Sequence, residues 1–154
     1  MSAKSFLAEF YPKPASRAID TLIEAADHSY QKWLGRLPKN LKKHDCHIYY
    51  SAVNVGDPGE SLPVLYYEES SCSLCRWSLK KINTHTKCSN CPITQLIGHA
   101  CDDDPTLEER SIYTKAICHN DPTEMIELLH KVRMFVRLNE LPKTVPWCSS
   151  PIMG

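Results

Sequence analysis

The sequence predicts a small α+β domain that is mainly helical and stapled by a metal-binding cysteine module. Three observations predict it. Apolar residues recur at helical spacing in separate segments, one stretch is rich in aromatic and β-branched residues, and two cysteine pairs share the spacing C-x2-C. The chain has 154 residues, the length of one compact domain, so we expect a single domain over 1–154.

Residues 16–37 form the first expected helix. Pro14 precedes the segment, and Gly35 and Pro38 mark its end. Apolar side chains recur at steps of three and four residues and make one face, which is typical of a helix packed on a core. That face consists of Ile19, Leu22, Ile23, Ala26, Tyr30, Trp33, Leu34 and Leu37.

A short β-hairpin is expected over residues 46–67. Residues 46–55 are rich in aromatic and β-branched side chains, and 62–67 form a second candidate strand. The Asp-Pro-Gly sequence at 57–59 predicts a turn between them, because proline and glycine supply the backbone angles that tight turns need.

The cysteine module spans residues 72–101. Cys72 and Cys75 form the first C-x2-C pair, and Cys88 and Cys91 form the second. Four thiolates at this spacing can close a tetrahedral site around Zn²⁺, because each pair places two sulfur atoms on one side of the metal. Such a site is coordinatively closed and supports folding, so we expect a structural zinc ion.

Other uses of the cysteines stay open. Cys101 could replace one of the four paired cysteines as a ligand, and His85 and His99 flank the second pair. An iron–sulfur cluster is an alternative, although the close cysteine run of bacterial ferredoxins is absent. Disulfides or free thiols are the remaining alternative, and the absence of a visible secretion signal disfavours the disulfides and favours reduced thiols and a metal. The residual cysteines are expected to be small buried residues: Cys46, Cys118 and Cys148.

Two short helices are expected next to the cysteine pairs. Residues 76–82 follow the first pair, with Trp77 as the apolar anchor. Residues 92–97 follow the second pair, starting at Pro92 and stopping at Gly98, because proline suits the first turn of a helix and glycine its end.

Residues 104–140 are expected to form a helical hairpin. Asp104 and Asp121 each precede a proline, which is typical of a capped helix start. The tail, 141–154, contains three prolines and is expected to be irregular. The second helix carries an apolar stripe of Met125, Leu128, Leu129, Val132 and Val136.

The charge balance excludes a global electrostatic attraction to nucleic acid or membranes. Eighteen basic and eighteen acidic residues give a formal net charge of zero, so such binding would need a local patch. No stretch approaches the roughly 20 apolar residues of a membrane span, and no apolar core of signal-peptide length occurs at the start. We therefore expect a cytoplasmic protein with no membrane partner.

A local basic patch lies in the cysteine module. Cations beside an aromatic ring can contact phosphates and stack a base, and a tryptophan lies among these. A second basic cluster, 39–44, follows the first expected helix. Solvated surface is the competing interpretation of both. The candidate nucleic-acid-binding residues of the module are Arg76, Lys80, Lys81 and Lys87.

Catalytic chemistry has little support. His119, Asn120 and His130 are loosely similar to the His-Asn-His arrangement of some zinc-containing nucleases, but the strand expected before it is not visible. The acidic run 102–104 could chelate a hard cation, although an acidic loop capping a helix is the favoured interpretation. No glycine-rich phosphate loop occurs. The sequence favours a protein without enzymatic activity.

Residues 72–101 carry a longer pattern than the four cysteines. It comprises Cys72, Leu74, Cys75, Cys88, Cys91, Pro92, Ile93, Gly98 and Cys101. This pattern resembles small uncharacterised cysteine-rich proteins encoded by tailed phages and prophages, which share a C-x-L-C, C-x-x-C-P-[IV] and C run. The resemblance implies metal binding at these cysteines and a phage accessory protein that binds a host component. A Thr-Pro-aromatic stretch that follows in that family is not evident here.

The function predicted from the sequence is that of a zinc-stabilised binding or regulatory protein with a protein partner. A zinc-containing nucleic-acid-binding protein or nuclease is the alternative. Salt-dependent binding separates the two classes, because phosphate contacts release counterions.

Overall fold

The computed structural model describes residues 2–57, 59–68, 71–82, 92–97 and 112–139. It is mixed helix and sheet, which confirms the expected fold class at this level. The elements in chain order are α1 (Ser2–Phe10), a 3₁₀ turn (Ala15–Arg17), α2 (Leu22–Leu34), α3 (Pro38–Lys43), β1 (Cys46–Tyr49), β2 (Ala52–Val55), β3 (Leu62–Tyr66), α4 (Ser73–Ile82), α5 (Pro92–Ile97), α6 (Ile112–Cys118) and α7 (Thr123–Asn139).

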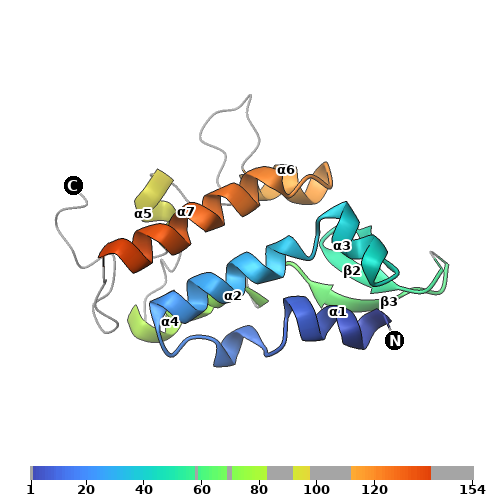
Figure 1. Cartoon of the computed structure of the whole chain (residues 1–154), viewed down its shortest axis with the longest axis horizontal. Coiled ribbons are helices and arrows are strands. Elements are labelled where there is room, and N and C mark those ends of the chain that lie inside the picture. Colours follow the sequence, from blue (N-terminus) through green and yellow to red (C-terminus); the bar gives the residue numbers. More distant parts are fainter. Residues whose placement is uncertain (1, 58, 69–70, 83–91, 98–111, 140–154) are drawn as a thin grey trace.

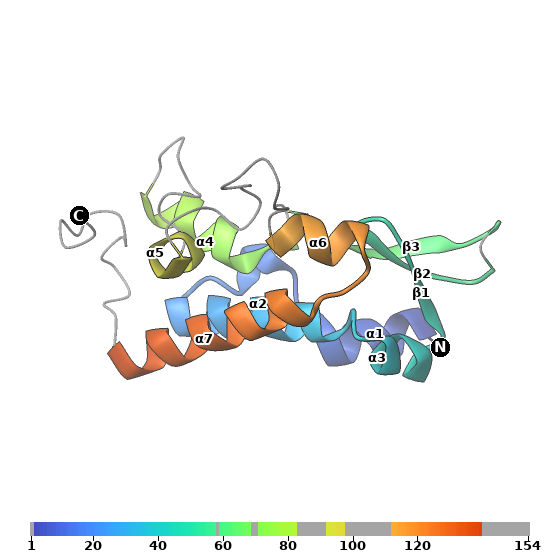
Figure 2. The same ribbon diagram turned by 90° about the horizontal axis from the view of Figure 1, so that it is seen from above.

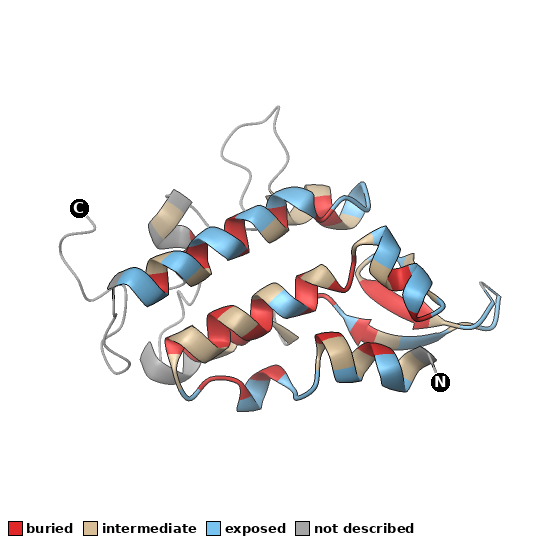
Figure 3. Ribbon diagram, in the orientation of Figure 1, coloured by how far each residue is buried: buried red, intermediate tan, exposed pale blue. Residues whose placement is uncertain are grey.

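The described elements are arranged along the two longest helices. The sheet, α1 and α3 lie toward one end, and α4 and α5 lie toward the other (Figures 1 and 2). Helices α2 and α7 run side by side between these ends, and buried residues line α2 along its length (Figure 3). Within the described ranges, no helix is long and apolar enough to cross a membrane.

Helix α2 is shorter than the segment 16–37 predicted for it. It begins after Thr21, whose side-chain oxygen accepts the backbone N–H of Glu24 at 3.0 Å and so satisfies an orphan donor. It ends at Leu34, and at the next residue, Gly35, an added Cβ would lie 2.8 Å from Cζ of Phe6. Glycine at this point therefore lets α1 pack closely against the end of α2.

Helices α1 and α3 were not predicted. Pro38 was interpreted as a stop, whereas it occupies the first turn of α3, where its missing N–H costs nothing. In α1, Phe6 and Phe10 are buried and their ring centroids lie 5.3 Å apart. A nine-residue helix is marginal by itself, so α1 depends on this packing, which local spacing does not reveal.

The expected hairpin is part of a three-stranded antiparallel sheet of order β1-β2-β3. The segment 46–55 forms two strands, because the chain reverses at Tyr50, which has a left-handed φ of 53°. Strand β2 then pairs with β3 in the antiparallel sense, and residue 58 of the predicted turn 57–59 lies outside the described residues. Tyr49 and Tyr66 both pair with Ala52, so the three side chains share one face of the sheet.

Helix α7 carries the predicted apolar stripe, and all five of its residues are buried. It packs against α2 and α6, which confirms its predicted contact with the first long helix. Asp27 of α2 binds Arg133 and Arg137 of α7, with 2.8 Å between Arg133 Nε and Asp27 Oδ1. Asp121 caps the start of α7 by accepting the N–H of Thr123 at 3.1 Å.

The remaining predictions are met in part. Helix α5 has the predicted bounds, and α4 begins three residues earlier than the predicted 76–82, with Trp77 fully buried as its anchor. The proposed helix start at Asp104 and the tail 141–154 lie outside the described residues.

Candidate metal centre

Cys72 occupies the N-cap position of α4. Its carbonyl oxygen accepts the first hydrogen bond of the helix, from the N–H of Arg76 at 3.0 Å. Its sulfur accepts hydrogen bonds from the backbone N–H groups of Leu74 and Cys75. Such groups have no acceptor within a helix, so the helix start holds this sulfur in place and favours negative charge on it.

Cys75 lies one helical turn after Cys72, and the two side chains are hydrogen-bonded to each other. This bond is the main reason why the pKa of the Cys72 thiol lies well below its ordinary value. The charge of Lys32 also lowers this pKa, while burial opposes both effects. The first C-x2-C pair therefore presents two adjacent sulfurs, one of them stabilised in the deprotonated form that a metal requires.

Helix α2 fixes the start of α4. Ser73 is fully buried, and its hydroxyl donates to the carbonyl oxygen of Ala25 at 2.6 Å. Lys32 is 1% exposed, and its ammonium donates to the hydroxyl of Ser71 at 2.7 Å. The residues on both sides of Cys72 are thus tied to one helix, which restrains the cysteine as outer contacts of a metal site do.

The second half of the candidate centre, Cys88 and Cys91, lies outside the described residues, as do Cys101, His85 and His99. Helix α5 begins directly after Cys91 with two buried residues, Pro92 and Ile93. Helix α4, which begins directly after Cys72 and contains Cys75, and helix α5, which begins directly after Cys91, lie toward the same end of the molecule (Figure 2). In the part of the chain that the structure describes, no three His, Cys, Asp or Glu side chains form a metal-binding group.

Comparison of this chain with protein-family models, curated proteins and solved structures finds no match. The resemblance of residues 72–101 to phage and prophage proteins therefore stays a prediction.

The candidate nucleic-acid-binding residues are only partly described. Arg76 lies in the first turn of α4 and is half-buried. Lys80 and Lys81 belong to the same helix by their backbone, and Lys87 lies outside the described residues. The structure thus describes the side chain of one of these four residues, and their grouping stays a prediction.

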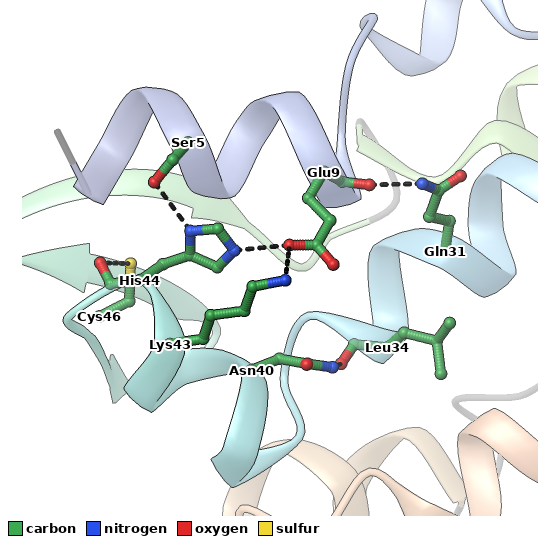
Figure 4. A network of polar contacts seen from close by, with 8 residues as sticks. All are labelled: Ser5, Glu9, Gln31, Leu34, Asn40, Lys43, His44 and Cys46. Carbon is green, nitrogen blue, oxygen red and sulfur yellow. Dashed lines mark hydrogen bonds and ion pairs between the residues drawn. The ribbon is translucent and has the colours of Figure 1, made fainter.

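The second basic cluster, 39–44, contains a histidine that is buried. His44 is 8% exposed, with the rings of Phe6 and Phe10 edge-on to its imidazole. Its Nε2 lies 2.7 Å from Oε1 of Glu9, and its Nδ1 lies 2.8 Å from the hydroxyl of Ser5 (Figure 4). Because a carboxylate only accepts, a neutral His44 donates through Nε2 and accepts from Ser5.

Sequence reasoning missed this network, because His44 lies 35 residues after Glu9 and 39 residues after Ser5. The spacing of four residues between Ser5 and Glu9 indicates only a helix. His44 lowers the pKa of Glu9, mainly by its hydrogen bond, and Lys43 adds to this with its ammonium 3.0 Å from Glu9 Oε1. The hydroxyl, imidazole and carboxylate tie α1 to the end of α3. Their role in the described structure is to join two helices.

The nuclease candidates occupy separate places. His119 is exposed beyond the end of α6, and Asn120 has a left-handed φ of 52° that reverses the chain. His130 is exposed on α7, seven residues after its start at Thr123, which is about 10 Å of helix rise. It packs on Tyr30, with 5.9 Å between ring centroids.

The residual cysteines differ from one another. Cys46 is half-buried, its thiol donates to the carbonyl oxygen of His44 at 3.4 Å, and burial raises the pKa of this thiol to about 11. Cys118 is exposed at the end of α6, so the expectation that it is buried was wrong, because the last turn of that helix lies at the surface. Cys148 lies outside the described residues.

Proposed function

We propose that this protein is a zinc-stabilised binding protein that acts by occupying a protein partner. The metal part of the proposal is supported by the adjacent sulfurs of Cys72 and Cys75 and by the donors that stabilise negative charge there. The resemblance of residues 72–101 to phage and prophage proteins makes a host protein the first class of partner to test.

The exposed apolar residues of the sheet carry the binding part of the proposal. Among the described residues, six large apolar side chains are exposed, and four of these belong to the sheet or its first turn. A large apolar cluster on a surface is typical of an interaction site, whereas scattered apolar residues are ordinary. The four are Tyr49, Tyr50, Leu62 and Tyr66, exposed by 66%, 68%, 68% and 49%.

The strand register places Tyr49 and Tyr66 on one face, with the small side chain of Ala52 between them. Two neighbouring strand spacings separate the backbone positions of these two tyrosines by about 10 Å. Tyrosine is enriched in interfaces, because it buries a large ring and keeps a hydroxyl for hydrogen bonding. The face therefore offers two amphipathic anchors at a fixed spacing.

Affinity capture with matched variants tests this proposal. A double variant with Tyr49→Ser and Tyr66→Ser is expected to lose the partner that the wild-type chain captures from its native cell. Leu138→Ser, which changes a residue 74% exposed on α7, is the control and is expected to retain it. Circular dichroism and thermal melting establish that each variant folds. Capture of the same protein by all three chains would contradict a binding site on the sheet.

Nucleic-acid binding is the alternative, and the same tyrosines give it a specific basis, because exposed rings can also stack on bases. Salt titration with single-stranded DNA and RNA separates the two. Binding that weakens steeply with salt and fails in the double tyrosine variant would favour the alternative. No binding, together with a tyrosine-dependent protein partner, would favour the proposal.

A further inference from the structure

The network that joins α1 to α3 also has the connectivity of a catalytic triad. The hydroxyl of Ser5 lies 2.8 Å from Nδ1 of His44, and Nε2 of the same imidazole lies 2.7 Å from Oε1 of Glu9 (Figure 4). A nucleophile, a base and a carboxylate that orients the base are connected in this order in enzymes that hydrolyse esters and amides. Both distances are those of hydrogen bonds, so the three groups are already connected in the required order.

The imidazole is held in the state that a general base requires. Because a carboxylate only accepts, neutral His44 donates through Nε2 to Glu9 and keeps the lone pair of Nδ1 for the hydroxyl proton of Ser5. The hydrogen bond from His44, with a second from Lys43, lowers the pKa of Glu9, so this carboxylate stays charged near neutral pH. Its charge stabilises the imidazolium that forms when His44 takes the proton.

Solvent reaches the nucleophile, whereas the base is enclosed. Ser5 is exposed on α1, while His44 is 8% exposed and the rings of Phe6 and Phe10 lie edge-on to it, with centroids 5.9 and 5.7 Å away. Hydrogen bonds that are shielded from water are stronger and fix the orientation of their members. A substrate can therefore approach Ser5 from solvent while the imidazole keeps its place.

An apolar hollow adjoins the nucleophile. It lies between α1, the segment 12–14 and Val64 of β3, and its volume of about 560 Å³ is within the range of small-molecule sites. Ala8 lines it and lies three residues after Ser5, which makes the two side chains neighbours on the surface of α1. Apart from two lysines the lining is apolar, and one of them, Lys4, directly precedes Ser5. The hollow thus suits the apolar part of a substrate.

We propose that Ser5, His44 and Glu9 form a catalytic triad that hydrolyses carboxylic esters with an apolar acyl chain. Ser5 is the nucleophile, His44 is the general base, and Glu9 positions His44. The hollow beside Ser5 holds the acyl chain, and the ammonium of Lys4 supplies positive charge for the oxyanion. This activity goes beyond the proposed function and depends on neither the metal nor the tyrosines of the sheet.

The reaction balances in two steps. Oγ of Ser5 attacks the ester carbonyl carbon, and its proton passes to Nδ1 of His44. The bond between that carbon and the alcohol oxygen breaks, and the alcohol leaves with this proton. Water then attacks the acyl-serine and gives a proton to Nδ1, and the bond to Oγ breaks as Ser5 takes that proton back. One ester and one water become one carboxylic acid and one alcohol.

Hydrolysis of naphthyl acetate and naphthyl hexanoate by the full chain tests the proposal. Ser5→Ala is expected to lower the rate to that of the spontaneous reaction. His44→Gln is expected to lower kcat at least about 100-fold, as the loss of a general base does. Ser16→Ala and His119→Gln change an exposed serine and an exposed histidine elsewhere, and both controls are expected to keep the wild-type rate.

Two further variants test the positioning role and the substrate class. Glu9→Gln keeps the shape of the side chain but removes its charge, so it is expected to lower kcat about tenfold or more while KM stays unchanged. Ala8→Phe fills part of the hollow and is expected to raise KM for the hexanoate several-fold more than KM for the acetate. Thermal melting establishes that each variant folds, and an unchanged kcat in folded Glu9→Gln would contradict its positioning role.

Covalent labelling of the wild-type chain makes the test independent of how the variants fold. An activated serine attacks the phosphorus of a fluorophosphonate, fluoride leaves, and the proton of the serine passes to the base. Peptide mapping by mass spectrometry is expected to find the label on Ser5 and not on Ser16. Hydrolysis that persists in Ser5→Ala, label spread equally over both serines, or folded wild-type protein with neither hydrolysis nor label would overturn the triad.

Discussion

Three ionisable side chains recur every fourth residue along α2 and just beyond it, and all three are buried. His28, Lys32 and Arg36 are 7%, 1% and 0% exposed. Arg36 donates to the carbonyl oxygen of Tyr50 at 3.0 Å, and its guanidinium lies 4.8 Å from the ring centroid of Tyr67. Lys32 lies 5.0 Å from the same ring. For Lys32 and Arg36, hydrogen bonds and aromatic faces thus partly replace the water that each cation loses on burial.

His28 makes stability depend on pH. Burial is the main cause that lowers its pKa, although Nε2 lies 2.7 Å from the carbonyl oxygen of Lys13. As the pH falls, His28 of the unfolded chain therefore binds a proton at about pH 6.5, whereas His28 of the folded chain binds one only at lower pH. Above that pH His28 contributes no pH dependence, and as the pH falls below it the free energy of unfolding decreases.

In His28→Gln, denaturant unfolding at pH 8 and pH 5.5 is expected to show a smaller loss of stability between the two pH values than in wild type. Protonation of metal ligands affects both chains equally and cancels in the comparison. The exposed His119→Gln is the control and is expected to behave as wild type. If the pH dependence of stability were unchanged in His28→Gln, His28 would accept a proton as readily in the folded chain as in the unfolded chain, which would contradict the prediction.

At the scale of elements, the contact between α2 and α7 organises the helical core. The stripe of α7 is buried, while Leu138 on the same helix is 74% exposed. Other faces of α2 are covered as well. Lys32 contacts Ser71, and Trp33 packs on Tyr67. Just beyond the end of the helix, Gly35 lies against Phe6. Helix α2 is therefore covered from several sides, which explains why so much of it is buried.

Leu129→Ala is expected to lower the free energy of unfolding by ~2–5 kcal/mol, because it removes a fully buried leucine and leaves a cavity. Leu138→Ala, on the exposed part of the same helix, is expected to change it by less than about 0.5 kcal/mol. Denaturant titration measures both. Equal effects of the two substitutions would mean that the stripe does not face the core.

At the scale of the molecule, the candidate metal centre would join segments that follow different parts of the fold. Cys72 is held by α2 through its neighbours Ser71 and Ser73, and Cys91 directly precedes α5, which packs on α7. A metal bound by both pairs would thus tie α4 on the α2 side to α5 on the α7 side.

Removal of the metal is expected to unfold the protein. Structural zinc contributes ~10–16 kcal/mol of apparent binding free energy in small modules, which exceeds the usual stability of a domain. Elemental analysis is expected to find about one zinc per chain, and a chelator or Cys72→Ser is expected to abolish the cooperative thermal transition. Cys118→Ser is expected to melt as wild type. Metal-free protein with an unchanged transition would refute the structural role.

Prediction from sequence succeeded where the signal was local and periodic. The stripe of α7 and the bounds of α5 follow from helical spacing and from proline and glycine. It failed where a helix depends on distant partners, as α1 does on Gly35 and His44. Within the candidate site, the spacing predicted Cys72 and Cys75 as partners, while the contribution of Lys32 required the structure.

The sequence by itself determined the class of the fold, most of its helices and the neighbouring positions of Cys72 and Cys75, because short-range spacing specifies all of these. The tertiary structure decided which buried groups meet. It placed Lys32 of α2 near Cys72, His44 against the two phenylalanine rings of α1, and two tyrosines on one face of the sheet. These contacts join residues far apart in the chain, and they depend on how helices and strands pack rather than on the order of residues along any one of them.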